Sequence, residues 1–311
     1  MMAVHLAAKA WGAGVVRPLR LRENEVYEIA FPSGERAALR LHRLGYQTKE
    51  SIGAELWWCA ALADAGQPVP RPMPSLAGDL LYTLDDGRLV SVVSWVEGQP
   101  LGEAGVRLEG SVDDQVQRHF LLGQLVASIH AATDLLVLPD GFQRHSWDRD
   151  GLVGESPVWG RFWDRPNLSS EDRKTLIWAR DFLAEALIAS QSPTGLIHAD
   201  VLRENVFVGP GGLSLLDFDD SGFGYRWYDL GTVLSQNLKE PGYEDIRKAL
   251  IQGYDPDNAA LADEIDLHTL ARCCASVGWA SSRLPPDDPV QQRHLDRAIA
   301  LAQWVRYRKT V

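Results

Sequence analysis

The chain has 311 residues, of which 45% are hydrophobic and 23% charged, and its formal net charge is −11. These proportions are typical of a globular protein with a sizeable core and exclude a largely disordered chain. The negative charge disfavours binding to nucleic acid, and no run of about 18 uncharged apolar residues is present that could span a membrane. We therefore expect neither nucleic acid nor a membrane as a partner; nothing in the sequence indicates the oligomeric state.

The cysteines and the first residues of the chain indicate the cellular compartment. Residues 1–14 contain a short apolar patch but no basic leader followed by a long apolar stretch, so a secretory signal is not expected. Cys59, Cys273 and Cys274 include an adjacent pair that suits neither an ordinary disulfide nor a zinc site. We interpret all three as buried reduced thiols of a cytoplasmic protein.

The first part of the chain is predicted to form strands. Residues 25–31 and 36–42 alternate between apolar and polar side chains around a Pro-Ser-Gly turn, which predicts a hairpin. A helix is expected over residues 49–65, and a second hairpin over residues 79–84 and 89–95, joined by Asp-Asp-Gly.

The remainder is predicted to be mostly helical. Amphipathic periodicity predicts helices over residues 113–132, 171–190, 244–254, 259–282 and 290–307, with one short β segment over 196–218. A small β-rich lobe followed by a larger helical lobe is an α+β arrangement, with the predicted lobes at residues 1–96 and 97–311. Small-molecule sites are common between such lobes.

The short β segment holds the residues with the clearest chemistry. It contains the pattern His198-Ala-Asp200, then Asn205, a Gly-rich hairpin, and Asp217. If Val208 pairs with Leu213 across the hairpin, the side chains of Asn205 and Asp217 emerge side by side. An amide oxygen and a carboxylate at that spacing suit Mg²⁺ bound to a nucleotide, and the Asp200 carboxylate can accept a hydroxyl proton.

The combination is more specific than its parts, since a His-x-Asp pair alone is common. For His198 in particular, a packed orienting role is favoured over a catalytic one.

This segment resembles the catalytic segment of the aminoglycoside phosphotransferases, which belong to the protein-kinase-like superfamily. Relatives include choline, homoserine and hydroxylysine kinases and a bacterial stress-response protein kinase. Further matching segments follow in the expected order: Ala38-Leu-Arg-Leu-His-Arg43, Val93-Ser-Trp-Val-Glu-Gly98, Ala127-Ser-Ile-His130 and Tyr228-Asp-Leu-Gly231. The resemblance implies a two-lobe protein-kinase-like fold.

The resemblance also implies residue roles in the second lobe. Asp200 would be the catalytic base, and Asn205 and Asp217 the Mg²⁺ ligands. Asp229 would be a buried structural acid that braces the catalytic loop.

In the first lobe, the resemblance assigns the nucleotide-binding residues. Glu55 would pair with the cation that clamps the phosphates. Backbone groups of Ser94, Trp95 and Val96 would contact the base of ATP or GTP.

Three features depart from the family pattern. Arg40 stands where the clamping residue is usually Lys, and Arg has a bidentate fork that suits phosphate. No Gly-x-Gly-x-x-Gly loop is present, because residues 21–26 read Leu-Arg-Glu-Asn-Glu-Val. Asp219 stands where protein kinases have a glycine after the metal-binding Asp. Two roles fit Asp219 equally well: ligand of a second cation, or cap of the following loop.

The residues that bind the phosphate acceptor are expected in residues 145–190 and in the last helices. Four tryptophans there suit either an ammonium-binding pocket or core packing, and core packing is expected for most of them: Trp147, Trp159, Trp163 and Trp178. Nearby acids favour an amine-bearing acceptor such as an aminoglycoside, homoserine or a choline-like alcohol: Asp148, Asp150, Glu155 and Asp164.

The predicted function is thus Mg²⁺-dependent transfer of the γ-phosphate of ATP or GTP to a small-molecule hydroxyl. The alternatives are a protein serine/threonine kinase and a catalytically silent nucleotide-binding module.

Overall fold

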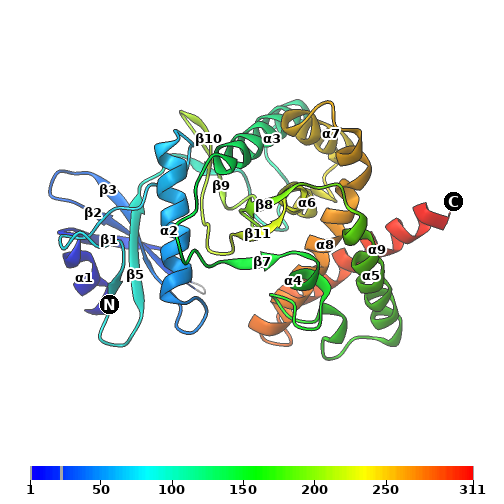
Figure 1. Ribbon diagram of the computed structural model, residues 1–311, viewed down its shortest axis with the longest axis horizontal. Coiled ribbons are helices and arrows are strands. Elements are labelled where there is room, and N and C mark those ends of the chain that lie inside the picture. The colour runs from blue at the N-terminus through cyan, green and yellow to red at the C-terminus, as the bar shows by residue number, and fades with distance from the viewer. Residues whose placement is uncertain (1, 22–23, 311) are drawn as a thin grey trace. The chain divides into compact units, whose positions relative to one another are not determined.

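The computed structural model describes residues 2–21 and 24–310, which form two compact units (Figure 1). Unit 1 consists of Met1–Gln99, Leu135–Arg144 and Phe207–Asp219, and unit 2 consists of Pro100–Asp134, His145–Val206 and Asp220–Val311. The two predicted lobes are continuous in sequence, whereas unit 1 gathers three separate stretches. The boundary after residue 96 stays a prediction.

Unit 1 is built on a five-stranded antiparallel sheet with the order β1-β2-β3-β5-β4. Its strands are β1 (Gly14–Leu21), β2 (Glu25–Ala30), β3 (Arg36–Leu41), β4 (Tyr82–Thr83) and β5 (Leu89–Ser94). The β2–β3 hairpin is confirmed. The second hairpin is also present, but β4 is only two residues long and shorter than the predicted arm.

Two helices cover the opposite sides of this sheet (Figure 1). Helix α1 (Met2–Ala10) packs Val4, Ala7 and Ala8 into the core that contains the buried side chains of β3. Helix α2 (Lys49–Asp64) begins at Thr48, whose hydroxyl accepts a hydrogen bond from the Ser51 amide. Sequence reasoning predicted α2 but neither α1 nor β1.

Strand β3 explains why Arg40 faces α2. Ala37, Leu39 and Leu41 are buried in the core beside α1, and the pleat turns alternate residues to the other side of the sheet. Arg40 therefore points toward Glu55 on α2.

The hairpin near the catalytic motif consists of β9 (Val206–Gly209) and β10 (Gly212–Leu215). The Leu215 amide donates to the Pro68 carbonyl, which ties β10 to the segment after α2 within unit 1. The two-residue strand β6 (Gln99–Pro100) lies where the first stretch of unit 1 ends.

Unit 2 contains a small sheet with the order β7-β11-β8 and most of the helices. The strands are β7 (His145–Trp147), β8 (Thr194–Ile197) and β11 (Gly222–Tyr225). The helices are α3 (Val112–Asp134), α4 (Arg149–Val153), a 3₁₀ turn (Phe162–Asp164), α5 (Ser170–Ala189), α6 (Arg226–Asn237), α7 (Tyr243–Tyr254), α8 (Ala259–Arg283) and α9 (Pro289–Thr310).

The five helices predicted for this part of the chain are confirmed as α3, α5, α7, α8 and α9, whereas α6 was not predicted. The core of unit 2 includes Cys273 and Cys274, and all three cysteines are buried free thiols. The predicted α+β class is confirmed. Within residues 2–21 and 24–310, no helix is both long and apolar enough to cross a membrane.

Candidate functional site

The predicted catalytic loop begins with a strained turn after β8. Ala199 has a φ of 64°, a left-handed conformation that costs a non-glycine residue free energy and therefore needs support. Asp229 on α6 supplies it, because its carboxylate accepts hydrogen bonds from the His198 amide (2.9 Å) and the Ala199 amide (2.6 Å). The contacts of Asp229 are those of a structural acid.

Asp229 is itself held by a chain of hydrogen bonds. His130 on α3 donates from Nε2 to Asp229 (3.1 Å), and its Nδ1 accepts from the Tyr254 hydroxyl (3.0 Å). Burial opposes ionisation of Asp229, but the bonds from His130 and His198 lower its pKa. Burial also lowers the pKa of His130, although its contact with Asp229 acts in the opposite direction.

Asp200, the predicted base, has both carboxylate oxygens engaged. Oδ1 accepts from Nη2 of Arg272 at 2.7 Å, and Oδ2 accepts from Nδ2 of Asn205 at 2.8 Å. The Asp200 amide donates to Nδ1 of His198, which is 1% exposed; this is the packed orienting role favoured from the sequence. Within unit 2, Asp200 and Asn205 are thus in direct contact.

Arg272 was missed by sequence reasoning. It lies on α8, 72 residues beyond Asp200, and is 4% exposed. A signal was present, because this arginine is the one charged residue in the run Leu270-Ala-Arg-Cys-Cys-Ala-Ser-Val277. A buried cation in such a run needs a partner.

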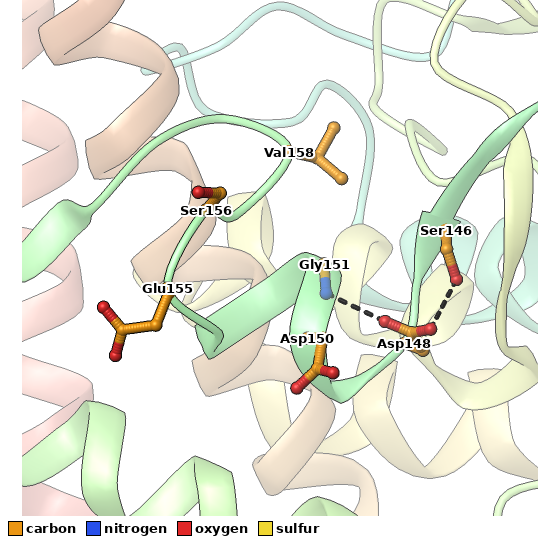
Figure 2. Close-up of a pocket in the computed structure, with 7 residues that line it drawn as sticks. All are labelled: Ser146, Asp148, Asp150, Gly151, Glu155, Ser156 and Val158. Carbon is orange, nitrogen blue, oxygen red and sulfur yellow. Dashed lines mark hydrogen bonds between the residues drawn. The ribbon is translucent and has the colours of Figure 1, made fainter.

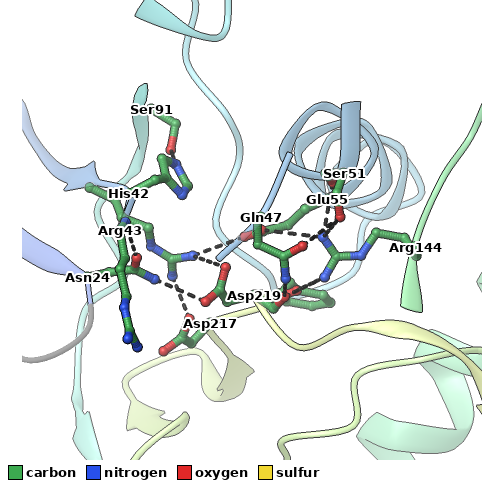
Figure 3. A network of polar contacts seen from close by, with 12 residues as sticks. Asn24, His42, Arg43, Gln47, Ser51, Glu55, Ser91, Arg144, Asp217 and Asp219 are labelled. Atoms are coloured by element: carbon green, nitrogen blue, oxygen red, sulfur yellow. Dashed lines mark hydrogen bonds and ion pairs between the residues drawn. The ribbon is translucent and has the colours of Figure 1, made fainter. Parts of the chain in front are cut away.

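In unit 1, Arg40 forms ion pairs with three carboxylates, those of Glu55, Asp217 and Asp219, which Figure 3 shows close together. Its Nη1 donates to Glu55 at 3.1 Å and its Nη2 to Asp217 at 2.6 Å. The predicted pairing of Arg40 with Glu55 is therefore present. Burial would lower the pKa of Arg40, but Asp217 and Glu55 raise it, so the guanidinium stays charged.

A second arginine, Arg144, was also missed. It donates to the Ser51 carbonyl on α2 and to the carbonyls of Phe218 (3.2 Å) and Asp219 (2.5 Å) (Figure 3). Arg144 thereby fixes the backbone after Asp217 to α2. Asp217 has a φ of 65°, so this support is at a strained position.

The contacts of Asp219 are those of a loop anchor. Its carboxylate accepts from Asn24 (3.0 Å), and its carbonyl accepts from Gln47 and Arg144. Burial raises the pKa of Asp219, and it also raises that of Glu55, to about 7. Residues 21–26, which stand where the Gly-x-Gly-x-x-Gly loop would be, lie partly outside the described residues.

The segment predicted to contact the nucleotide base follows β5. The Ser94 amide donates to the Arg71 carbonyl at 2.7 Å, so this backbone donor is already engaged. The Arg36 guanidinium lies over the Trp95 ring, with 4.5 Å between Cζ of Arg36 and the ring centroid. The contact of Ser94, Trp95 and Val96 with the base stays a prediction.

The predicted metal ligands fall in different units, Asn205 in unit 2 and Asp217 in unit 1. Asn205 directs Nδ2 to Asp200, so its carbonyl Oδ1 is the atom that suits a hard cation. Among the described residues, no group of three or more His, Cys, Asp or Glu has a metal-binding arrangement. The side-by-side placement of Asn205 and Asp217 stays a prediction.

Residues 145–190, the segment predicted to bind the acceptor, contain both buried tryptophans and exposed carboxylates. Trp147 and Trp159 are buried in the core of unit 2, as packing predicts, and Trp163 and Trp178 pack at its edge. Three carboxylates line an open hollow of about 560 Å³ in unit 2 (Figure 2): Asp148, Asp150 and Glu155. Asp148 caps α4 through the Gly151 amide, and Glu155 pairs with Arg161.

Comparison with known proteins gives several relatives that are named as small-molecule kinases. The chain is 27% identical to the amicoumacin kinase of Bacillus subtilis (strain 168) over 280 residues, which cover 87% of this chain and 73% of that protein. It is 30% identical over 216 residues to the homoserine kinase of Rhizobium meliloti (strain 1021), covering 68% of this chain. The chain spans 61% of the length of that homoserine kinase.

A solved structure extends the likeness to the whole chain. It is that of a microcompartment-associated aminopropanol kinase, with a TM-score of 0.83, 28% identity, and coverage of 99% of this chain and 98% of that one. The predicted kinase-like fold is therefore confirmed. Residues 15–263, which include every residue of the catalytic motif, match the phosphotransferase enzyme family, and the chain belongs to that family.

Proposed function

We propose that the protein transfers the γ-phosphate of a Mg²⁺–nucleotide complex, ATP or GTP, to a hydroxyl group of a small amine-bearing molecule. The observation that carries the proposal is the Asp200 carboxylate, fixed at both oxygens on a loop that Asp229 braces. A carboxylate held in this way can accept the hydroxyl proton as the oxygen attacks phosphorus.

The other roles follow from the contacts within each unit. Asn205 and Asp217 would supply one oxygen each to Mg²⁺, which completes its shell with phosphate oxygens and water. Arg40, oriented by Glu55, would contact the phosphates, and residues 94–96 would contact the base. Mg²⁺ would neutralise charge on the phosphates, and the chain's own residues would position the acceptor and take its proton.

The amine-bearing acceptor is supported by charge and by the relatives. Asp148, Asp150 and Glu155 line the hollow in the acceptor segment, where an ammonium group would find opposite charge. The relatives are named as kinases of homoserine, amicoumacin and aminopropanol. This agreement favours an amino alcohol or a related amine.

The first experiment measures transfer directly. Purified protein, Mg²⁺ and terminally labelled ATP or GTP are incubated with homoserine, aminopropanol and choline, and with a cell extract separated into metabolites and proteins. Label on a small molecule that requires Asp200 supports the proposal. Label on proteins alone would instead favour a protein kinase, and Asp200-dependent label in neither fraction would favour the silent module.

Two substitutions test the assigned roles. Asp200→Asn should lower turnover by about 10²–10⁴-fold, because an amide cannot take up the hydroxyl proton, and it should leave nucleotide binding nearly intact. Asp217→Asn should weaken Mg²⁺-dependent nucleotide binding. Asp181→Asn, on the exposed face of α5, is the matched control. Equal mild losses at positions 200 and 217 would contradict both assignments.

A further inference from the structure

The catalytic loop is held from two helices at the same residue. The Ala199 amide donates to Asp229 on α6, and the Ala199 carbonyl accepts from Nη1 of Arg272 on α8 at 3.0 Å. The other nitrogen of the same guanidinium, Nη2, donates to the Asp200 carboxylate at 2.7 Å. One planar group therefore fixes both the backbone before Asp200 and the side chain of Asp200.

Arg272 is itself held rigidly. Its guanidinium lies over the Trp159 ring, with 4.6 Å between Cζ and the ring centroid. Trp159 packs edge-on against Trp147, which stacks on Tyr228. These aromatic side chains are almost completely buried, so the arginine has little freedom to leave Asp200.

The backbones around Arg272 approach one another closely. A Cβ added at Gly278 on α8 would lie 2.7 Å from the Trp159 carbonyl oxygen, so only glycine lets the Trp159 loop pack there. A Cβ at Gly231 on α6 would lie 2.5 Å from the His268 carbonyl carbon of α8. Helix α8 is thereby set against both the Trp159 loop and the helix that carries Asp229.

The charge of Arg272 is maintained despite burial. Burial alone would lower its pKa, but Asp200, Tyr228 and Asp220 raise it. The guanidinium thus stays charged and donates charge-assisted hydrogen bonds, which are shorter and stronger than neutral ones. Lysine could not reproduce this arrangement, because its ammonium group is a point charge without a planar fork.

We infer that Arg272 is a positioning residue of the transfer reaction, which holds the Asp200 carboxylate in the orientation that accepts the hydroxyl proton. The inference rests on the proposed function. In the step concerned, the acceptor oxygen bonds to the γ-phosphorus, the bond from that phosphorus to the bridging oxygen breaks, and the nucleoside diphosphate leaves. The hydroxyl proton passes to Asp200. Arg272 touches none of the reacting atoms and acts through Asp200.

The test compares Arg272→Lys and Arg272→Met with the wild type at saturating Mg²⁺–nucleotide. Loss of orientation alone should lower kcat by about 100-fold in the Met variant, since a shift of about 1 Å at a reacting group can have that effect. The Lys variant should retain part of the activity, with a loss of about 10-fold. KM for the nucleotide should stay within about twofold in both.

Arg247→Met is the matched control, because Arg247 also donates to a carbonyl (Ala262) and pairs with a carboxylate (Asp266) of α8. It should retain wild-type kcat. If the Met variant does not fold, as thermal melting would show, the Lys variant alone decides. An Arg272→Lys protein with the kcat of the control would overturn the inference, as would a loss confined to KM for the nucleotide.

The outcome separates this inference from the proposed function. Transfer by the wild type that disappears in Asp200→Asn but survives in both Arg272 variants overturns the inference alone. Absence of any Asp200-dependent transfer by the wild type overturns the proposed function, and with it the role of Arg272.

Discussion

At the scale of single residues, Arg40 has a geometry that lysine cannot copy. Its two terminal nitrogens contact carboxylates that are far apart in sequence, Glu55 and Asp217. A guanidinium bridges the two carboxylates with separate N–H groups. A lysine ammonium group would contact only one of them closely, or both at longer distances. Arg40 therefore links α2 to the segment of Asp217.

Arg40→Lys should accordingly lose one of the two contacts. We expect the free energy of unfolding to fall by about 1.5–3 kcal/mol, the usual contribution of a hydrogen bond to a charged group. Urea denaturation measures this change. The control is Arg17→Lys, because Arg17 on β1 is a mostly exposed arginine that pairs with Glu28 on β2. An Arg40→Lys protein as stable as the wild type would show that one contact suffices.

Residue-scale prediction succeeded where a segment carries a recognisable motif: Asp229 braces the catalytic loop and Arg40 pairs with Glu55, as expected. The roles of Asp200 and Asn205 stay predictions, and their direct contact was not predicted.

Arg144 and Arg272 lie outside these motifs. The apolar run around Arg272 indicates a buried cation but not its partner, and both arginines contact residues that are 72 to 93 positions away. Contacts of that range depend on packing, which local sequence does not encode.

At the scale of elements, the contact between α6 and α8 positions both supports of the catalytic loop. Gly231 lies where the two helix backbones meet, and no side chain fits between them. The same helix pair places Asp229 on one side of Ala199 and Arg272 on the other.

Gly231→Ala should therefore force the two helices apart. Its Cβ would meet backbone atoms of His268 and Thr269 at 2.5 and 2.6 Å, and such overpacking costs about 1–3 kcal/mol. Gly53→Ala is a sharp control, because that position on α2 has no atom within 4 Å of the added Cβ. Alanine there should stabilise the helix by about 0.5–1 kcal/mol. Urea unfolding curves of both variants check these opposite signs.

Most of the longer helices were predicted from their periodicity, and some of them also carry a capping residue. Thr48, Ser169 and Asn258 each cap a helix that the sequence analysis identified. Helix α6 has no side-chain cap, and nearly all its residues, polar as well as apolar, are buried, so its polar side chains do not mark a solvent-exposed face. Strand β1 contains Pro18 and has register shifts, which obscure its alternation.

At the scale of the whole molecule, buried neutral histidines govern the response to acid. Burial lowers the pKa of four of them to about 3 or 4: His42, His119, His268 and His294. Each takes up a proton near pH 6.5 only when the chain unfolds. The stability linked to them is complete above pH 6.5 and is lost as the pH falls toward 4.

Stability should therefore decrease from pH 6.5 to 4.5, by up to about 1.4 kcal/mol per pH unit for each histidine. Glu55, with its pKa raised to about 7, acts in the opposite sense over this range and offsets one of the four. Urea midpoints at several pH values measure the slope. His268→Gln should make it shallower and the exposed His5→Gln should not; equal slopes would contradict the assignment.

Unit 1 is made of three separate stretches of the chain, so it cannot finish folding until the last of them has been synthesised. The sheet and α2 leave the ribosome long before residues 135–144 and 207–219, which carry Arg144 and Asp217. Until then Arg40 has Glu55 but not Asp217, and α2 lacks its link through Arg144. No fragment that ends before residue 219 can therefore contain a complete unit 1.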